Sequence, residues 1–220
     1  MPDRMAFPAP PRRPLPRRFF ARDTVDVARD LLGCTLWAAS GATVCAGRIV
    51  EVEAYLDERD PASHAGRGPT PRSAIMFGPP GVAYVYLIYG RHHCLNAVTE
   101  QDGRAGAVLI RALEPLVGRG AMRDRAGRGG RAPTSLCAGP GRLCRALGID
   151  LRWNGLPLTG KARNGPNNSS SGRVWIAAGR PPIRISRGPR IGIRRAADRP
   201  LRFCDAESRC LSRPPHHGSL

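Results

Sequence analysis

The stretch that decides the fold is "GVAYVYLIYGRHHCLNAVTE", residues 81–100. β-Branched and aromatic residues fill both of its halves, and Gly90-Arg91 stands between them. Such residues favour strands, and two strand-like runs joined by a short glycine-containing turn favour an antiparallel hairpin. We therefore expect residues 81–100 to form a hairpin that turns at Gly90-Arg91.

Strand-like runs continue on both sides of this hairpin. "AGAVLIRALEP" (residues 105–115) is an apolar strand, and "CTLWA" (34–38) and "ATVCAGRIVEVEAYL" (42–56) are two strands joined at Ser40-Gly41. "PPIRISRGPRIGIRR" (181–195) predicts one or two late strands. These runs indicate a mostly antiparallel sheet, and helices beside it make the fold class α+β.

Two segments have the pattern of helices. "DTVDVARDLLG" (23–33) offers Asp23 or Thr24 as a cap, and Gly33 suits the end of the helix. "SLCAGPGRLCRALGID" (135–150) contains a second helix. "GRGAMRDRAGRGGRAP" (118–133) is expected to be a basic, glycine-rich loop.

The chain of 220 residues fits one domain. Residues 1–17 are rich in proline and arginine, so we expect a disordered basic arm there. The domain proper is predicted over residues 18–205, and residues 206–220 are expected to form a flexible tail.

The charge points to a polyanionic partner. The sequence has 35 basic and 17 acidic residues, a formal net charge of +18, and Lys161 is its only lysine. Nucleic acid is the commonest partner of so basic a chain, and arginine suits bidentate phosphate recognition. A ribosomal-type or merely basic protein is the alternative that charge alone leaves open.

The seven cysteines suggest reduced thiols in a cytoplasmic protein. Their number is odd and no C-x-x-C occurs, which argues against a zinc ribbon, an iron–sulfur cluster or a secreted disulfide framework. We expect no metal and no organic cofactor. No signal-peptide pattern and no membrane-spanning run are recognisable.

Two carboxylates and one aromatic ring share a face of the strand at residues 42–56. Alternation turns Val50, Val52 and Ala54 to one side, and Glu51, Glu53 and Tyr55 to the other. The second set is either a solvated strand face or an acid held where a polyanion arrives. This segment does not choose between them.

All four tyrosines lie in or beside two neighbouring strands: Tyr55 in one, and Tyr84, Tyr86 and Tyr89 in the other. Tyr84 is expected to pack in the core. Tyr89, at a hairpin tip beside Gly90, could enter a stack of bases, because aromatic side chains serve as wedges in nucleic-acid proteins.

Motifs over residues 18–204 resemble those of the alkyladenine (3-methyladenine) DNA glycosylase family. The matching pieces are "RIVEVEAY", "DPASH", "TPRSAIMF", "PGVAYVYLIYG", "VLIRALEP", "AGPGRLCRALGI" and "GPRIGI…PLRF". The resemblance implies a single α+β domain with a curved, mostly antiparallel sheet and a protruding β-hairpin. It also implies an enzyme that flips alkylated or deaminated purines out of duplex DNA, hydrolyses the N-glycosidic bond and leaves an abasic site.

The resemblance also implies roles for individual residues. By similarity, Glu53 activates water and Arg111 helps to orient it, although a core salt bridge is the alternative for Arg111. The base would lie between Tyr55 on one side and His64 and Tyr86 on the other. The implied roles of the remaining two site residues are that Asn96 disfavours the guanine amino group and that Tyr89 fills the gap left by the flipped base.

Glu51 has no role assigned by the resemblance. It could raise the proton affinity of Glu53 or bind a structural partner.

Glycosylases that also cut the strand attack with an amine. The only lysine, Lys161, lies in a Gly/Asn/Ser-rich loop. We therefore expect a monofunctional, monomeric glycosylase. The alternative is a non-catalytic, arginine-rich nucleic-acid-binding protein.

Overall fold

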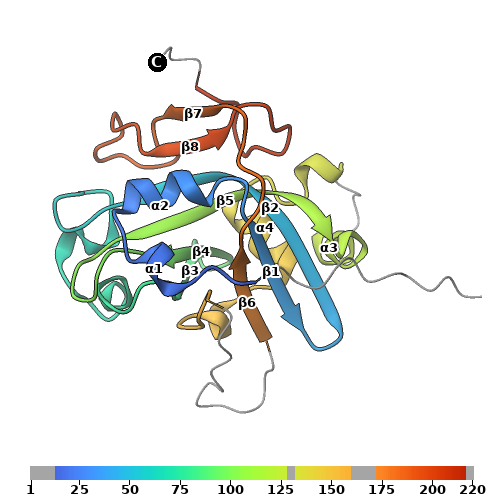
Figure 1. Cartoon of the computed structure of the whole chain (residues 1–220), viewed down its shortest axis with the longest axis horizontal. Helices are drawn as coiled ribbons and strands as arrows, with labels where there is room; N and C mark the ends of the chain where they lie inside the picture. The colour runs from blue at the N-terminus through green and yellow to red at the C-terminus, as the bar shows by residue number, and fades with distance from the viewer. Residues whose placement is uncertain (1–12, 128–131, 160–171, 217–220) are drawn as a thin grey trace, which may run out of the picture.

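The computed structural model describes residues 13–127, 132–159 and 172–216 (Figure 1). Its strands form one eight-stranded sheet in which every described pair is antiparallel, so the expected α+β class is confirmed. The strands are β1 (Thr35–Ser40), β2 (Thr43–Tyr55), β3 (Ala83–Ile88), β4 (His92–Val98), β5 (Ala107–Val117), β6 (Gly172–Ala177), β7 (Ile185–Gly188) and β8 (Arg202–Asp205). We did not anticipate β6 or β8, and of the one or two strands expected at 181–195 the structure has β7.

β2 is the centre of the sheet. The main order is β3-β4-β5-β2-β1-β6, and β7 pairs with β8, which also pairs with β2. Along one edge, β2 pairs with β5 from Ala46 to Tyr55. Along the other edge, the first half of β2 pairs with β1 and Glu51–Glu53 pairs with β8. The late strands β7 and β8 therefore lie next to the acidic part of β2.

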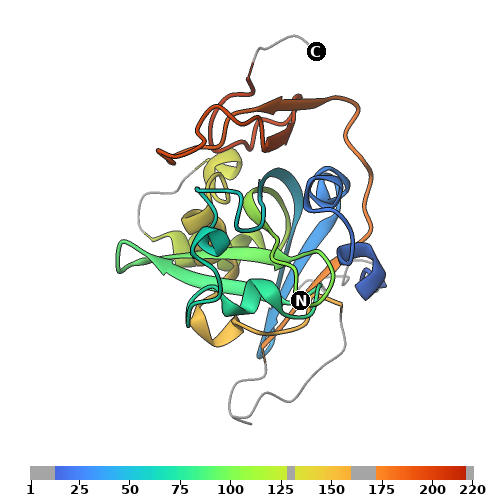
Figure 2. The same cartoon turned by 90° about the vertical axis from the view of Figure 1, so that its left-hand side faces the viewer.

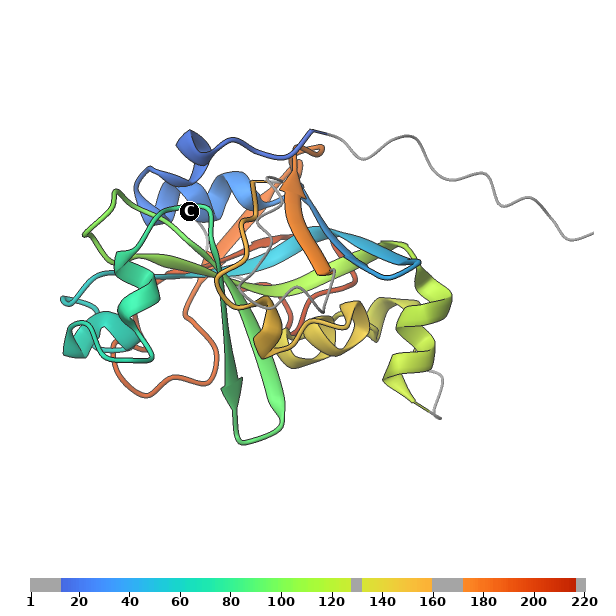
Figure 3. The same ribbon diagram turned by 90° about the horizontal axis from the view of Figure 1, so that it is seen from below.

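The β3–β4 hairpin projects from the body of the molecule, as Figures 2 and 3 show for the green strands. Its turn is centred one residue earlier than we expected. Tyr89 and Gly90 have φ angles of 52° and 68°, and the Arg91 N–H donates to the Ile88 carbonyl. Two central residues with positive φ are the pattern of a type I′ turn, which matches the twist of paired strands. The turn places Tyr89 at the tip.

The helices are short. They are α1 (Arg17–Phe20), α2 (Thr24–Leu31), α3 (Arg119–Ala126) and α4 (Pro140–Leu147), with single turns of 3₁₀ helix at η1 (His64–Arg67), η2 (Ala74–Phe77), η3 (Pro133–Ser135) and η4 (Leu151–Trp153). The Asp23 side chain caps α2 by accepting from the N–H groups of Val25 and Asp26. Gly33, with φ of 85°, follows the end of the same helix, as predicted.

The loop expected at 118–133 was wrong in its first half, because α3 occupies Arg119–Ala126. Met122 is fully buried in the core, and the Arg125 guanidinium donates to the Ala146 carbonyl at the end of α4. These tertiary contacts stabilise a helix that the glycines in and around it do not suggest. Residues 128–131 lie outside the described part of the chain.

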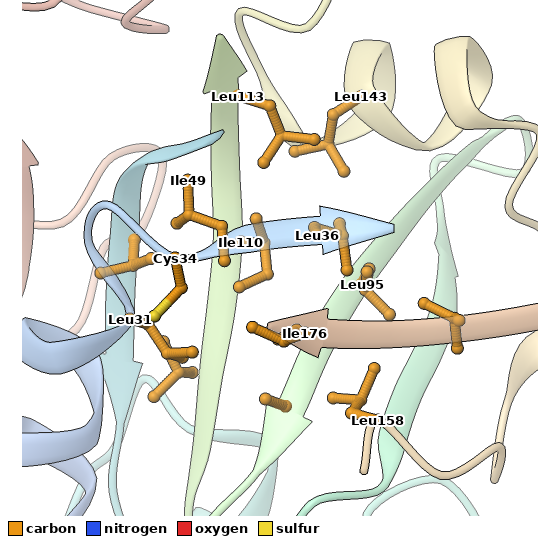
Figure 4. Packing of buried hydrophobic residues seen from close by; sticks show 14 of the residues in the cluster. Leu31, Cys34, Leu36, Ile49, Leu95, Ile110, Leu113, Leu143, Leu158 and Ile176 are labelled. Carbon is orange, nitrogen blue, oxygen red and sulfur yellow. The ribbon is translucent and has the colours of Figure 1, made fainter. Parts of the chain in front are cut away.

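The main core lies between the sheet and the helices. Leucine and isoleucine side chains from α2, α4 and strands β1, β2, β4, β5 and β6 meet there (Figure 4). All seven cysteines are buried and unpaired. Among the described helices, none is long and apolar enough to cross a bilayer.

Both ends of the described chain are more ordered than we expected. Within the arm predicted at 1–17, the Leu15 N–H donates to the Ile176 carbonyl and Leu15 is buried; residues 1–12 lie outside the described residues. Within the tail predicted at 206–220, Cys210 is buried and Ser212 donates two hydrogen bonds to Glu51. Cys210 and Ser212 thus attach this segment to the sheet, whereas Glu207, Arg209 and Arg213 are exposed.

Candidate active site

An irregularity in the β2–β5 ladder places a buried arginine between two buried carboxylates. Ile49 pairs with Leu113, Glu51 with Ala112 and Val52 with Ile110, so Arg111 has no partner residue in the ladder. Bulges of this kind redirect side chains and occur beside active sites. Arg111 Nε lies 3.2 Å from Glu51 Oε1, and its Nη1 lies 3.2 Å from Glu53 Oε2. The solvated strand face that we considered for these acids is excluded, because both are fully buried.

Three donors hold the Glu53 carboxylate. Oε2 accepts from Arg111 and from the Tyr55 hydroxyl, which is 2.9 Å away, and Oε1 accepts from the Ile191 N–H at 2.7 Å. Burial nevertheless raises the pKa of Glu53 above its ordinary value of 4.5, against the lowering effect of these donors. The group is thus a desolvated carboxylate with a raised proton affinity, as a general base requires.

A cavity of about 340 Å³ opens in front of this carboxylate. Glu53 itself does not line the cavity, but its three hydrogen-bond donors Tyr55, Arg111 and Ile191 do. The lining also includes His64, Arg72, Tyr84, Tyr86 and Asn96. Five of the residues singled out from the sequence thus line one cavity: Tyr55, His64, Tyr86, Asn96 and Arg111.

Aromatic rings form one wall of the cavity. The ring centres of His64 and Tyr86 are 4.8 Å apart with the planes at 70°, and those of Tyr84 and Tyr86 are 5.2 Å apart. Tyr84 is buried, as expected, yet its hydroxyl also lies 2.8 Å from His64 Nδ1. This edge-to-face cluster fixes the Tyr86 ring, which is suited to contact a planar aromatic ligand.

His64 is neutral in this wall. Burial first, and then the positive charge of Arg72, lower its pKa from 6.5 to about 4. A neutral ring does not repel a positively charged base.

Arg190 packs on the Tyr55 ring and is itself held by Asp60. The guanidinium carbon of Arg190 lies 4.7 Å from its centre, and Arg190 is bound to Asp60 by two hydrogen bonds of 2.5 and 2.8 Å. Arg190 does not line the cavity. It therefore packs on Tyr55 outside the cavity lining.

Asn96 lies at the buried end of the cavity. Its side chain is almost fully buried, and its Nδ2 donates to the Tyr84 carbonyl at 3.0 Å. This bond uses the Asn96 side-chain amide as a donor and fixes the orientation of that amide. The backbone of β3 therefore sets how Asn96 is presented to a ligand.

Tyr89 stands apart from the other candidates. Its side chain is 83% exposed at the hairpin tip, and it is not part of the cavity lining. An exposed aromatic ring on a projecting hairpin is placed to contact a surface outside the protein.

We had not singled out Asp60, Arg72, Arg190 and Ile191 from the sequence. Arg72 lies with its guanidinium carbon 4.9 Å from the Tyr86 ring centre, at the cavity wall. In the sequence, these four residues were indicated only by their position inside the short motifs "DPASH", "TPRSAIMF" and "GPRIGI". The motifs suggested family membership but no roles for the residues.

A larger cavity elsewhere in the protein is not an alternative to this site. This cavity of about 570 Å³, lined by Arg48, Asp205 and the Pro181–Ile183 segment, contains none of the candidate residues. Within the residues that the structure describes, no three His, Cys, Asp or Glu side chains are grouped to hold a metal ion.

Comparison with known proteins agrees with this geometry. Residues 18–209 match the model of the methylpurine-DNA glycosylase family. A protein of Methanoculleus marisnigri is 51% identical over 202 residues, covering 90% of this chain and 98% of its own length. A protein of Rhodopseudomonas palustris is 50% identical over 200 residues, covering 91% and 88%. Both bear the name "Putative 3-methyladenine DNA glycosylase".

Proposed function

Because the chain belongs to the methylpurine-DNA glycosylase family, whose members hydrolyse N-glycosyl bonds in DNA, we propose that it flips alkylated or deaminated purines out of the duplex. It then hydrolyses the N-glycosidic bond and leaves an abasic site. The observation that supports this most is the aromatic cavity of about 340 Å³ directly in front of the Glu53–Arg111 pair. Extrusion is required because the target carbon is shielded inside the base stack.

Glu53 is the proposed base that activates water. Glu53 does not line the cavity itself, but the donors to both of its oxygens, Tyr55, Arg111 and Ile191, do. A water held there by Arg111 gives one proton to Glu53 and attacks C1′ of the sugar as the bond to the base breaks. The electron pair of that bond leaves with the purine, so a positively charged alkylpurine departs as a neutral base. A carboxylate also stabilises the cation-like sugar of this reaction.

The extruded purine lies between Tyr55 and the wall formed by His64 and Tyr86. Each electron-rich ring attracts a cationic base by about 0.5–2 kcal/mol. Asn96, at the buried end, disfavours a base that carries the exocyclic amino group of guanine. Tyr89 occupies the space that the flipped nucleotide leaves in the duplex.

The partner is double-stranded DNA, bound by a monomer in the cytoplasm at the nucleoid. The net charge of +18 supports phosphate contacts, which release counterions and make binding salt-dependent. The reaction as proposed uses water, one carboxylate and aromatic walls, and it needs no metal or organic cofactor.

The enzyme is proposed to be monofunctional. Strand cleavage by a glycosylase starts from an amine that forms a Schiff base. Lys161, the only lysine, lies outside the described residues, and no amine belongs to the cavity lining. Borohydride should therefore trap no covalent protein–DNA adduct, and a trapped adduct would contradict this part of the proposal.

Base release from methylated duplex DNA tests the function, with wild type beside Glu53→Gln. Wild type should free 3-methyladenine, and the variant should bind the same DNA as tightly while releasing no base. If wild type binds DNA but frees neither methylated purines nor hypoxanthine or ethenoadenine from duplexes that contain them, the protein is a DNA-binding module instead.

A further inference from the structure

Glu51 is a second buried carboxylate beside the proposed site, and four donors surround it. Its Oε1 accepts from Arg111 Nε at 3.2 Å, Arg202 Nε at 2.8 Å and the Ser212 hydroxyl at 2.7 Å. Its Oε2 accepts from the Ser212 N–H at 2.6 Å. Glu51 is fully buried, so these bonds replace all of its hydration.

Two of the four donors belong to Ser212, in the segment that follows β8, and a third belongs to β8 itself. Arg202 lies in β8, and besides Glu51 it binds the carbonyl groups of Arg213 and Pro214 at 2.7 and 3.2 Å. Cys210 packs with Val50 and Ala112 in a small cluster of its own. Arg202 thus connects residues 213–214 with Glu51, the carboxylate that Ser212 also binds. The segment 206–214 therefore covers Glu51.

The charges of this group are balanced. Glu51 and Glu53 face Arg111 and Arg202, giving two negative and two positive side chains that are all buried. Arg202 and Ser212 donate most of the hydrogen bonds that the Glu51 carboxylate accepts. The Arg111 guanidinium therefore does not turn wholly toward Glu51, and its Nη1 stays directed at Glu53. The remaining end of the guanidinium, Nη2, lies 3.4 Å from the Ser212 hydroxyl. Three contacts therefore fix the plane of Arg111.

We propose that Glu51, Arg202 and Ser212 are positioning residues that hold Arg111 against Glu53. This inference rests on the proposed function, since it gives Arg111 its task of orienting water. It assigns to Glu51 a structural role toward Arg111.

Variants of Ser212 test the idea. Ser212→Ala loses the hydroxyl bonds, Ser212→Pro also loses the N–H donor, and Ser212→Thr keeps both. Ser208→Ala is the matched control, because the Ser208 hydroxyl accepts from Cys210 N–H in the same segment and does not touch Glu51. The measurements are the single-turnover rate of 3-methyladenine release, the Kd for duplex DNA and the Tm.

The release rate should fall about 10- to 100-fold in Ser212→Pro, since small displacements of a catalytic group have effects of this size. The release rate should fall less in Ser212→Ala, Ser212→Thr should keep most of the rate because it keeps both donors, and Ser208→Ala should match wild type. Kd should not change. In an Arg111→Lys background, the Ser212 substitutions should not lower the release rate further. If Ser212 had a purely structural role, they would lower the rate in both backgrounds.

Three results would overturn the inference: wild-type rates in Ser212→Pro, an equal loss in Ser208→Ala, or a loss that persists unchanged beside Arg111→Lys. A wild type that releases no base overturns the proposed function instead, so the two failures are distinguishable.

Discussion

Arg190 stacks its guanidinium on Tyr55 while Asp60 binds that guanidinium with two hydrogen bonds. Both charged side chains are completely buried. The ion pair therefore forms a rigid backing for a ring that also donates to Glu53, and it connects the loop after β2 with the loop after β7. Tyr55 has little freedom to turn away from a ligand.

Breaking this ion pair should destabilise the protein strongly. Asp60→Asn leaves the buried Arg190 charge without its counter-charge, which costs about 3–5 kcal/mol of unfolding free energy. Urea denaturation of both proteins measures the difference. The control is Asp102→Asn, which breaks the exposed pair with Arg17 and should cost at most about 1 kcal/mol. Equal losses in the two variants would contradict the structural role of Asp60.

The rate of base release should depend on the raised pKa of Glu53. Only the ionised carboxylate can accept a proton from water, so the rate falls about tenfold for each pH unit below that pKa. Because burial raises the pKa, the acid limb should have its midpoint above 4.5. Single-turnover release of 3-methyladenine across pH gives the midpoint, and Glu53→Gln should show no such limb. A midpoint at or below 4.5 would contradict the desolvated state of Glu53.

His64 should titrate with a midpoint near pH 4, which NMR can follow by the signal that disappears in His64→Phe. Since the folded-state pKa is below the ordinary 6.5, the neutral ring stabilises the fold fully above pH 6.5, and this contribution is lost as the pH falls toward 4. Arg72→Ala should raise the midpoint, yet not to 6.5, because burial is the larger cause. A midpoint of 6.5 in wild type would contradict the buried position of the ring.

Tyr89 stores backbone strain at the hairpin tip. It has φ of 52° and makes little contact, being 83% exposed. Tyr89→Gly should therefore raise the unfolding free energy by about 1 kcal/mol, since glycine adopts this conformation without penalty. Both Tyr89→Gly and Tyr89→Ala should slow base release from matched duplexes, and Ala should bring no gain in stability. Release from mispaired sites should suffer less, because such bases cost less to extrude.

α3 should contribute to stability through Met122. Met122→Ala should lower the unfolding free energy by about 2–5 kcal/mol, because the side chain is fully buried. Arg123→Ala, on the exposed side of the same helix, should change it by less than about 0.5 kcal/mol. Similar effects would mean that α3 does not pack on the core.

Strong local patterns in the sequence predicted much of the fold. The β3–β4 hairpin, β2, β5 and the capped helix α2 follow from alternation, β-branched residues and Asp23. β6, β8 and α3 did not follow from such patterns. α3 depends on burial of Met122 and on the Arg125–Ala146 bond, which join segments distant in sequence. The alternation in β2 also suggested one polar face, whereas residues 50–54 are all fully buried. Ser212, in the segment after β8, and Ile191 bind the two carboxylates of the second face, and this is a tertiary effect.

The site was predictable only in part. The residue types and the resemblance singled out Glu53, Arg111, Tyr55, His64 and Tyr86, and the last four lie around one cavity with Glu53 directly behind it. The ladder irregularity at Arg111 and the partners of Glu51 depend on pairing between β2, β5 and β8, which the spacing of residues in the chain does not reveal.

The burial of all seven cysteines has a consequence for the conditions under which a methylpurine glycosylase works. Agents that methylate purines also methylate thiolates, so the stress that produces the lesion threatens exposed sulfur in every protein nearby. Burial raises the pKa of Cys34 to about 11 and that of Cys137 to about 12, which keeps these groups as weakly nucleophilic thiols. The fold thus keeps its own sulfur buried and protonated, away from the chemistry that produces the lesion.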